Sequence, residues 1–515
     1  MRLNRWAVVV CILVSSCAAQ NAEEKAAKYM ESVRHQPGLL LAFLQQMPKG
    51  GDLHVHLAGA IYAESMIDWA SESALCVDRS TSKLIRAACD SCEPYKPKPS
   101  VRCAYQDHIL YNQLVDAWSM RNWHPAEESG HDHFFETFEK FGPALDKHIG
   151  EATAEVASRA AADHLQYVEV MQTADGGQAA ILGTKLLGEG EIGMASDFAG
   201  LRDKLLAGGM SDVVAKVRAQ TDADEARRKE MLHCGIPDAM QSLSPDPGCA
   251  VTIRYLYQVL RGLPREQVFA QILLGFELAK ADPRFVGFNL VMPEDWYVPM
   301  HDFDLHMRMI EALHKFYPRV HVSLHADELA MGLVPPEGLR FHIRESIERA
   351  GAERIGHGVG VMSENDPIGL LEEMAKKRVL VEICLTSNEM ILGVTGDRHP
   401  LPIYMKYGVP VALATDDQGV ARGDMTHEYL RAAETYNLSY RDLKRMARAS
   451  LEHSFIPGAS LWSEGREFRR VEACEGESAS GDDVSKKCGD WLAANERARV
   501  QWQLEKAFAE FEKRF

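Results

Sequence analysis

The sequence contains no long run of basic residues. Its 74 acidic residues outnumber its 57 basic ones, which gives a formal net charge of −17 at pH 7. Binding to nucleic acid requires clustered lysine and arginine side chains that neutralise phosphates, so we expect no nucleic-acid partner. The acidic balance also disfavours adsorption to anionic membranes. Hydrophobic residues make up 46% of the chain and charged residues 25%, as is usual for a soluble globular enzyme.

The apolar segment at the N-terminus is too short to cross a bilayer. Basic residues precede an apolar stretch at residues 6–14, and small residues follow it. This order is typical of a signal peptide, which we predict at residues 1–19. The protein is then exported, to be secreted, periplasmic or lipid-anchored. Two cleavage sites stay open: ordinary signal peptidase would cut before Gln20, whereas a bacterial lipobox would place a lipid anchor on Cys17.

Cysteines lie mostly outside the apolar runs. Eight of them occur in three stretches that look like insertions or a tail: Cys76, Cys89, Cys92 and Cys103; Cys234 and Cys249; Cys474 and Cys488. Local pairs in irregular segments suit an oxidising compartment. We predict the disulfides Cys234–Cys249 and Cys474–Cys488, with the first four cysteines paired among themselves. A zinc site at Cys89 and Cys92 is the weaker alternative, and Cys384 is expected to be a free core thiol.

Short apolar runs alternate with amphipathic stretches along most of the chain. The runs that we expect to be strands are Asp52–Leu57, Tyr167–Met171, 251–260, Phe285–Met292, Val320–His325, Arg354–His357, Val379–Cys384 and Val409–Ala414. Alternation of apolar strands with helices predicts a parallel sheet in an α/β fold. About eight strands in roughly 400 residues fit a (β/α)8 TIM barrel. A doubly wound sheet is the alternative, which the lack of a glycine-rich phosphate loop after an early strand weakens.

Three regions are expected after the signal peptide. Residues 20–46 are expected to form an N-terminal helical extension, ended by the Met-Pro-Lys-Gly-Gly sequence at residues 47–51. The barrel is expected at residues 47–465, with a cysteine-bearing and proline-rich insertion at residues 71–125 after the first strand. Residues 466–515 form a C-terminal helical tail. The extension and the insertion are candidates for contacts in a homodimer.

Side chains that bind metals lie at the ends of four expected strands. They are His54 and His56, His325 followed by Glu328, His357, and Asp416 with Asp417. In a (β/α)8 barrel this end of the strands carries the chemistry. Each residue alone also fits a loop, a turn or a helix cap. The four positions together favour one shared metal, a water that it activates, and acid/base partners, which is the chemistry of a hydrolase.

In this order, these residues resemble the adenosine deaminase family of the amidohydrolase superfamily. The matching segments are Met47-Pro48-Lys49, Leu53–His56, Tyr167–Val170, His325–Glu328, Arg354–Gly358, Glu382–Asn388 and Thr415–Asp417. The signal peptide, the leading helices and the cysteine-bearing insertion resemble the secreted adenosine deaminase-related growth factor branch. The resemblance implies a metal-dependent hydrolase barrel with one Zn²⁺. Its ligands would be His54, His56, His325 and Asp416, the last also serving in catalysis.

The resemblance also implies roles around the substrate. Glu328 would donate a proton to the purine ring nitrogen N1, and His357 would orient the attacking water and help to deprotonate it. Asp417 would hold the purine. Met292 occupies the place of a glycine whose backbone N–H meets the purine, and Ala58 replaces an acidic residue that contacts the ribose.

Two more departures from the family pattern are Asp327, where glycine is usual, and Leu385, where proline is common. The departures leave the nucleoside open: adenosine, deoxyadenosine or a modified purine nucleoside. The aromatic residues Phe134, Phe135 and Phe138 fit either an apolar lid over the purine or the packing of a helix.

The predicted function is therefore zinc-dependent deamination of adenosine or 2′-deoxyadenosine to inosine or 2′-deoxyinosine and ammonia, outside the cytoplasm. The segment Tyr167–Met171 contains no lysine that could bridge two metals, which argues for one metal ion. One alternative is another mononuclear amidohydrolase, such as a deaminase of a modified adenine nucleoside. The other is a non-catalytic secreted barrel with a signalling or nucleoside-binding role.

Overall fold

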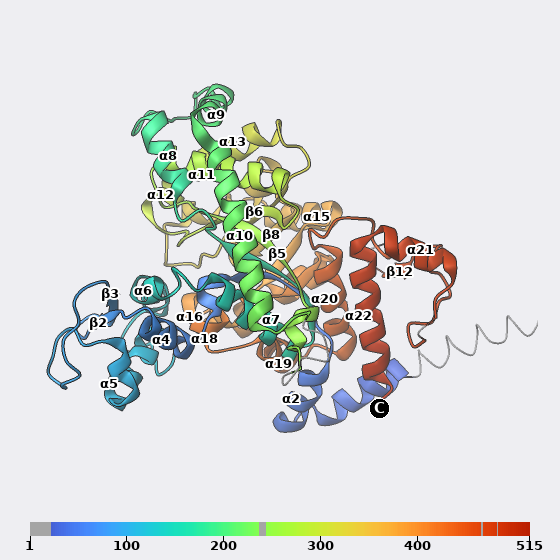
Figure 1. Ribbon diagram of the computed structural model, residues 1–515. Coiled ribbons are helices and arrows are strands. Elements are labelled where there is room, and N and C mark those ends of the chain that lie inside the picture. Colours follow the sequence, from blue (N-terminus) through green and yellow to red (C-terminus); the bar gives the residue numbers. More distant parts are fainter. Residues whose placement is uncertain (1–21, 236–243, 465–466, 482) are drawn as a thin grey trace, which may run out of the picture.

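The computed structural model describes residues 22–235, 244–464, 467–481 and 483–515 (Figure 1). Among them, eight parallel strands follow one another in chain order around one sheet: β1 Gly50–His56, β4 Leu165–Gln172, β5 Thr252–Leu260, β6 Phe285–Val291, β7 His321–Ala326, β8 Arg354–His357, β9 Leu380–Ile383 and β10 Val411–Leu413. A parallel bridge between Val55 and Asp416 joins the first strand to the residues after the last. The sheet closes, which confirms the predicted (β/α)8 barrel.

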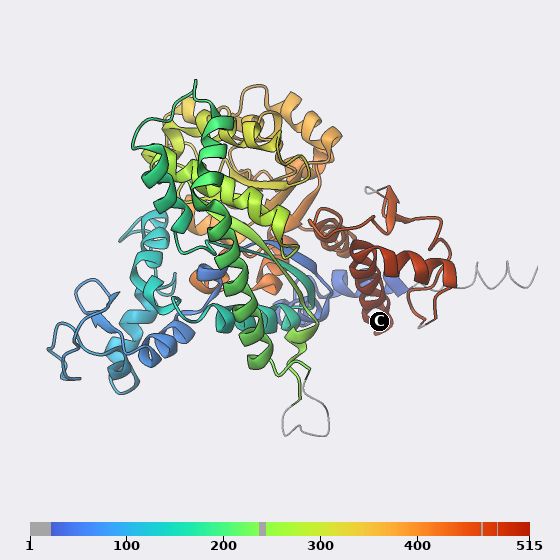
Figure 2. The same cartoon turned by 45° about the horizontal axis from the view of Figure 1, so that its top comes forward.

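Helices cover the outside of the barrel (Figure 2). They are α7 Ile149–Ala162, α8 Gln178–Leu187, α9 Phe198–Leu205, α10 Ser211–Met231, α11 Arg265–Ala281, α13 Phe303–His314, α14 His342–Glu348, α15 Pro367–Lys377, α17 Leu401–Tyr407, α19 Met425–Thr435 and α20 Tyr440–Glu452. Every residue of β6, β8, β9 and β10 is buried. Strands with a filled barrel on one side and helices on the other must be apolar on both faces, which explains the continuous apolar runs in the sequence.

Short helices follow several strands at the mouth of the barrel. They are α3 Leu57–Ala60, α12 Tyr297–His301, α16 Leu385–Leu392 and α18 Gln418–Ala421. At the opposite end, α20 contacts β1 and β10. This helix begins with a capping box, in which Ser439 and Asp442 each bind the other's backbone N–H.

The segment between α4 Ala63–Glu72 and α6 Gly130–Phe141 projects to one side of the barrel (Figure 1). It contains β2 Cys76–Asp78, β3 Lys83–Ile85, η1 Val101–Tyr105 and α5 His108–Ala117. Two disulfides cross-link it, Cys76–Cys89 and Cys92–Cys103. The predicted pairing of these four cysteines among themselves is confirmed, and the structure supplies the connectivity.

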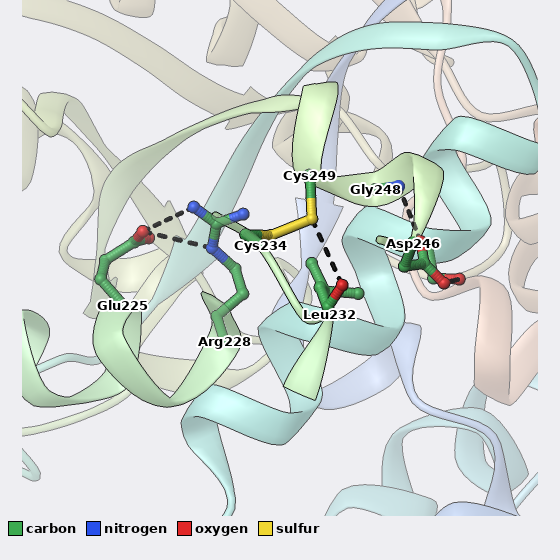
Figure 3. Close-up of a disulfide and its surroundings, with 8 residues drawn as sticks. Glu225, Arg228, Leu232, Cys234, Asp246, Gly248 and Cys249 are labelled. Carbon is green, nitrogen blue, oxygen red and sulfur yellow. Dashed lines mark hydrogen bonds and ion pairs between the residues drawn. A yellow bond between two sulfur atoms is a disulfide. The ribbon is translucent and has the colours of Figure 1, made fainter. Parts of the chain in front are cut away.

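The other two predicted disulfides are confirmed as well. Cys234, just after α10, is bonded to Cys249 in η5 Pro247–Ala250, ahead of β5 (Figure 3). Cys474 is bonded to Cys488 in α21 Lys486–Ala494, beyond the small hairpin of β11 Trp462–Glu464 and β12 Arg469–Arg470. Cys384 is a buried free thiol, as expected.

The two ends of the described chain lie side by side. The N-terminal helices, residues 22–33 and α2 Pro37–Gln46, pack on α22 Glu496–Glu512, where the ring centroids of Phe43 and Phe511 are 5.0 Å apart. The expected helical stretch is interrupted ahead of Pro37, because the residue before a proline is disfavoured in a helix.

Residues 1–19 lie outside the described residues, so the signal peptide and the domain boundaries stay predictions. Within the described ranges, no helix combines the length and the apolar character needed to cross a bilayer.

Candidate metal centre and active site

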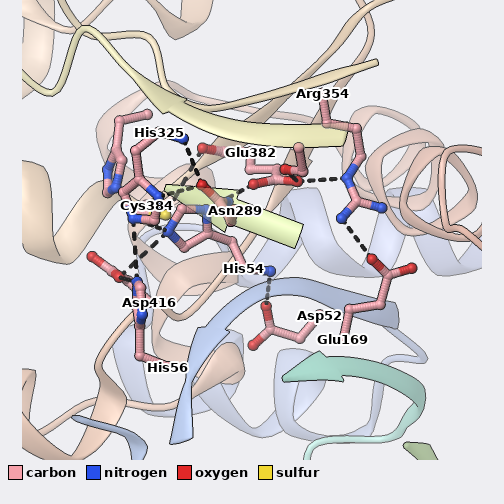
Figure 4. Close-up of polar contacts among 12 residues, drawn as sticks. Asp52, His54, His56, Glu169, Asn289, His325, Arg354, Glu382, Cys384 and Asp416 are labelled. Carbon is pink, nitrogen blue, oxygen red and sulfur yellow. Dashed lines mark hydrogen bonds and ion pairs between the residues drawn. The ribbon is translucent and has the colours of Figure 1, made fainter. Parts of the chain in front are cut away.

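The four expected metal ligands converge at the carboxyl ends of β1, β7 and β10 (Figure 4). The Nε2 atom of His325 lies 3.1 Å from Nε2 of His54 and 3.2 Å from Nε2 of His56. Oδ1 of Asp416 lies 3.6 Å from Nε2 of His54 and 3.4 Å from Nε2 of His56. In a tetrahedral site with bonds of about 2.0–2.1 Å, neighbouring ligand atoms are about 3.3–3.4 Å apart. The observed separations bracket that value, so these residues fit a tetrahedral metal ion.

The second ring nitrogen, Nδ1, of each of these histidines faces a side-chain oxygen. The pairs are His54 with Glu382 at 2.7 Å, His325 with Asn289 at 2.9 Å, and His56 with Gln258 at 2.9 Å. Because these oxygens accept, the ring protons belong on Nδ1 and the Nε2 lone pairs point into the cluster. Three lone pairs and a carboxylate at such short range repel one another unless positive charge lies among them.

The pKa of His54 also indicates that the cluster favours positive charge. Burial by itself would lower the pKa of this ring. Hydrogen bonds to the carboxylates of Asp416 and Glu382 outweigh burial and raise the pKa to about 10. For His325, burial and the neighbouring imidazoles hold the pKa well below its usual value. The cluster therefore favours a positive charge, which a divalent ion can supply.

Two overlapping sets of side chains could hold a metal among the described residues. The first is His54, His325, His357 and Asp416, and the second is His56, Asp416 and Asp417, each with donor atoms within 4.8 Å of one another. His357 is the member that was expected to act on the attacking water and not to bind the metal. Its Nδ1 lies 3.0 Å from Nδ2 of Asn388, and its Nε2 has no hydrogen-bond partner in the described chain. His357 thus borders the cluster with one nitrogen free for a ligand or water.

A cavity of about 480 Å³ opens over the cluster. Seven of the eight expected site residues line it: His56, Met292, His325, Glu328, His357, Asp416 and Asp417. The eighth, His54, lies behind it and is fully buried. Phe134, Phe135 and Phe138 of α6 form an apolar part of the wall and also pack on one another, so their packing role is confirmed and a lid over the purine stays a prediction. The volume suits a small molecule of nucleoside size.

Two carboxyl groups in the cavity have unpaired oxygens. Glu328 Oε1 and Asp417 Oδ1 are buried, and neither has a hydrogen-bond partner in the described chain. Burial, with the charges of Asp416 and Glu294, holds the pKa of Glu328 well above its ordinary value. Burial and the adjacent Asp416 raise the pKa of Asp417 in the same way. A raised pKa favours the protonated form of a carboxyl group, which can donate a hydrogen bond to a bound ligand.

Two glycines make room for these side chains. A Cβ atom at Gly59 would lie 1.6 Å from Oδ1 of Asp417, and one at Gly356 would lie 2.5 Å from Cε1 of His54. Both distances are far below any real contact, so a larger residue at either position would displace a site residue.

Four residues around the cluster have a left-handed backbone: Met292 at φ 89°, Asp327 at φ 63°, His357 at φ 67° and Asp416 at φ 57°. Met292 and Asp327 are the two positions where glycine is usual in the family pattern. Glycine adopts this conformation without strain. Met292 and Asp327 adopt the same left-handed backbone although they carry side chains. Such strained conformations are common at functional sites.

Sequence reasoning assigned no role to the residues that hold the site residues in place. Arg354 pairs with Glu382 and Glu169 at 2.6 Å each, and all three are fully buried. Glu294 accepts the backbone N–H groups of Asp327 and Glu328 at 3.1 and 2.8 Å. Charged residues inside apolar strands could have indicated these supporting contacts, since a buried charge needs a partner.

Comparisons with known proteins agree with this geometry. A model of the adenosine deaminase family matches residues 228–461. The adenosine deaminase of Escherichia coli strain SMS-3-5 is 31% identical over 194 residues, which are 37% of this chain and 48% of that protein. The adenosine deaminase of strain SE11 is 35% identical over 137 residues, which are 26% of this chain and 38% of that protein. The chain thus spans about half or less of the length of the curated relatives that it matches.

A solved structure shares the fold. It is the crystal structure of arabidopsis ADAL complexed with IMP, with a TM-score of 0.51 and 17% sequence identity. The superposition covers 91% of this chain and 99% of that chain. The family-model match includes His325, Glu328, His357, Asp416 and Asp417 but begins after β1. The part played by His54 and His56 therefore rests on the geometry described above.

Proposed function

We propose that the protein is a hydrolase that deaminates a purine nucleoside, since residues 228–461 match a model of the adenosine deaminase family. The substrates that we propose are adenosine and 2′-deoxyadenosine, with one Zn²⁺ per chain. Water adds its oxygen to the ring carbon that carries the amino group, the carbon–nitrogen bond breaks, and ammonia leaves. One proton of the water ends on the ring nitrogen and the other on the ammonia.

The observation that carries this proposal is a metal-ligand cluster that shares one cavity with two buried carboxyl groups, Glu328 and Asp417, each with an unpaired oxygen. His54, His56, His325 and Asp416 would hold the ion. The ion, when bound, would lower the pKa of water to about 7 and so supply a nucleophile at neutral pH. The raised pKa of Glu328 is needed for its part, because the ring nitrogen must gain a proton as the neighbouring carbon becomes tetrahedral.

Other residues would bind and orient the purine. Asp417, with its raised pKa, can donate a hydrogen bond to a ring nitrogen. The aromatic side chains of α6 would cover the ring and exclude water. Ala58 lines the same cavity and offers no carboxylate to a ribose. ADAL of arabidopsis, which shares the fold, is complexed with the purine nucleotide IMP. We extend a purine ligand to this chain as part of the proposal.

The test uses purified full-length protein and a panel of purine nucleosides. Loss of the ultraviolet absorbance of adenosine and release of ammonia are expected, with about one equivalent of zinc by elemental analysis. His56→Ala should lose metal and activity together. A protein that is fully active without metal, or one that contains zinc and deaminates no member of the panel, would refute the proposal.

We also propose that the protein is exported. The four disulfides support this, since such bonds persist in oxidising compartments. Mass spectrometry of the mature N-terminus would distinguish the two cleavage sites. A chain that starts at Gln20 indicates a secreted or periplasmic protein, and one that starts at a lipidated Cys17 indicates an anchored protein. A cytoplasmic protein with an intact N-terminus would contradict export.

A further inference from the structure

Two buried side chains outside the cavity connect to His357. Asn388 lies on α16 and is fully buried, and His399 lies two residues before α17 with 2% of its surface exposed. Neither lines the cavity. The three residues form one chain of hydrogen bonds, which runs from the backbone of Leu401 through His399 and Asn388 to His357.

The backbone fixes the proton of His399. The N–H of Leu401 lies 3.1 Å from Nδ1 of His399. A backbone N–H can only donate, so Nδ1 accepts and the ring carries its single proton on Nε2. That Nε2 lies 3.1 Å from the side-chain oxygen of Asn388, and therefore donates to it.

The proton of His399 in turn fixes the amide of Asn388. Its oxygen faces His399, so its NH₂ group faces His357, with 3.0 Å between Nδ2 and Nδ1. An amide nitrogen only donates, so Nδ1 of His357 bears a lone pair and the ring proton lies on Nε2. Glu328 Oε1 is 3.6 Å from the same Nδ1, which is too far for a competing hydrogen bond.

We propose that His399 is a positioning residue that acts through Asn388 to hold His357 as the tautomer with its proton on Nε2. The consequence for deamination rests on the proposed function. With a proton on Nε2, His357 donates a hydrogen bond to the oxygen of the attacking water and stabilises that oxygen as negative charge develops. The same nitrogen has no lone pair, so it does not take the proton of the water. That proton passes to another group, and Glu328 can receive it after giving its own proton to the ring nitrogen.

The first test reads the tautomer directly and needs no activity. The full-length protein, with histidine labelled with ¹⁵N, is examined by NMR, and His357 is assigned from the signals lost in His357→Gln. We expect an unprotonated Nδ1 and a protonated Nε2. Asn388→Asp keeps the shape but replaces the donor by a carboxylate, so Nδ1 of His357 should then become protonated. A wild-type His357 with its proton on Nδ1 would overturn the proposal.

The second test compares two substitutions of His399. His399→Gln places an NH₂ group close to the position of Nε2 and preserves the donor to Asn388, whereas His399→Leu removes it. We expect His399→Leu to lower kcat by about 10- to 100-fold with little change in KM, as is usual when the support of a reacting residue is lost. His399→Gln should restore most of the rate and the wild-type tautomer.

A matched control is His306→Leu, which removes another fully buried histidine, in α13, whose two ring nitrogens have no partner in the described chain. It should leave both kcat and the tautomer of His357 unchanged, because His306 contacts neither Asn388 nor His357 through a hydrogen bond. A purely structural His399 would behave like this control, and equal kcat values in His399→Leu and the wild type would also overturn the proposal. If the wild-type protein deaminates no nucleoside, the proposed function fails, while the NMR result still decides the tautomer.

Discussion

His54 donates a hydrogen bond to Glu382, with 2.7 Å between Nδ1 and Oε2, and both side chains are fully buried. Glu382 in turn pairs with Arg354, which pairs with Glu169 (Figure 4). Two carboxylates thus face a single guanidinium. The excess negative charge behind His54 makes its ring a stronger electron donor, which favours a metal on its other nitrogen.

Glu382→Gln should weaken metal binding while it preserves the shape of the side chain. The amide is neutral, so it orients His54 less strongly and leaves Arg354 with one carboxylate. We expect a loss of about 10- to 100-fold in metal affinity. We also expect a loss of about 3 kcal/mol in the free energy of unfolding, because a buried ion pair is broken. Elemental analysis after dialysis against a graded series of chelator concentrations, and urea denaturation, measure the two effects.

The control for this substitution is Glu353→Gln. Glu353 also pairs with a histidine, His321, at 2.8 Å, but 50% of its side chain is exposed. Exposed pairs contribute about 0–1 kcal/mol, so both metal content and stability should stay near the wild-type values. Equal metal retention in the two variants would mean that Glu382 does not support the metal site.

Glu328→Gln separates the metal from the proton transfer. Glu328 is not one of the four converging ligands, so the variant should keep its metal. Glutamine cannot deliver a carboxylic proton, and kcat should fall by about 10²- to 10⁴-fold. Steady-state kinetics and elemental analysis on the same preparation check this. Glu337→Gln, at an exposed position of η6 Pro336–Leu339, is the control. Wild-type turnover in Glu328→Gln would remove Glu328 from the mechanism.

Glu294→Gln tests how the loop after β7 is held. Each carboxylate oxygen of Glu294 accepts one backbone N–H, from Asp327 and from Glu328. An amide can accept only one of them, and its NH₂ group faces the other N–H. We expect a loss of roughly 1.5–3 kcal/mol in stability, since hydrogen bonds to charged groups have this strength. Glu328 should shift, so kcat should fall while the metal content stays constant. A normal kcat would show that Glu328 is positioned without Glu294.

The strands and the metal ligands could be predicted because their signals are local. All eight apolar runs became barrel strands, with ends that differ by a few residues at most, and the sheet topology brought His54 and His325 together across 271 residues. A strand buried on both faces is recognisable without knowledge of its neighbours. The end of such a strand is then the natural place to look for polar side chains in a barrel.

The supporting residues could not be predicted because their partners depend on the closed fold. Glu382 meets His54 from a position 328 residues away, and Glu294 contacts backbone groups and not a recognisable side chain. Met292 shows a second limit, since methionine does not indicate the left-handed backbone found there.

Glu364 offers a test of pH dependence away from the metal cluster. It follows η7 Val361–Ser363 and accepts the backbone N–H groups of Ile343 and Arg344 at the start of α14, at 2.6 and 3.3 Å. Its other oxygen is buried and has no partner in the described chain. Burial outweighs the two hydrogen bonds and raises the pKa of Glu364 from 4.5 to about 7.

A raised pKa means that the folded protein holds this proton more tightly than the unfolded chain. The stabilisation is complete below pH 4.5 and is lost as the pH rises through 7. Its full size is roughly 3 kcal/mol at most. Glu364→Gln has no such proton. The unfolding free energy of the wild type, relative to that of the variant, should therefore fall as the pH rises across this interval. Urea denaturation from pH 4.5 to 8 measures that difference, with Glu372→Gln on α15 as an exposed control. A difference that does not change with pH would show that Glu364 titrates normally in the folded protein.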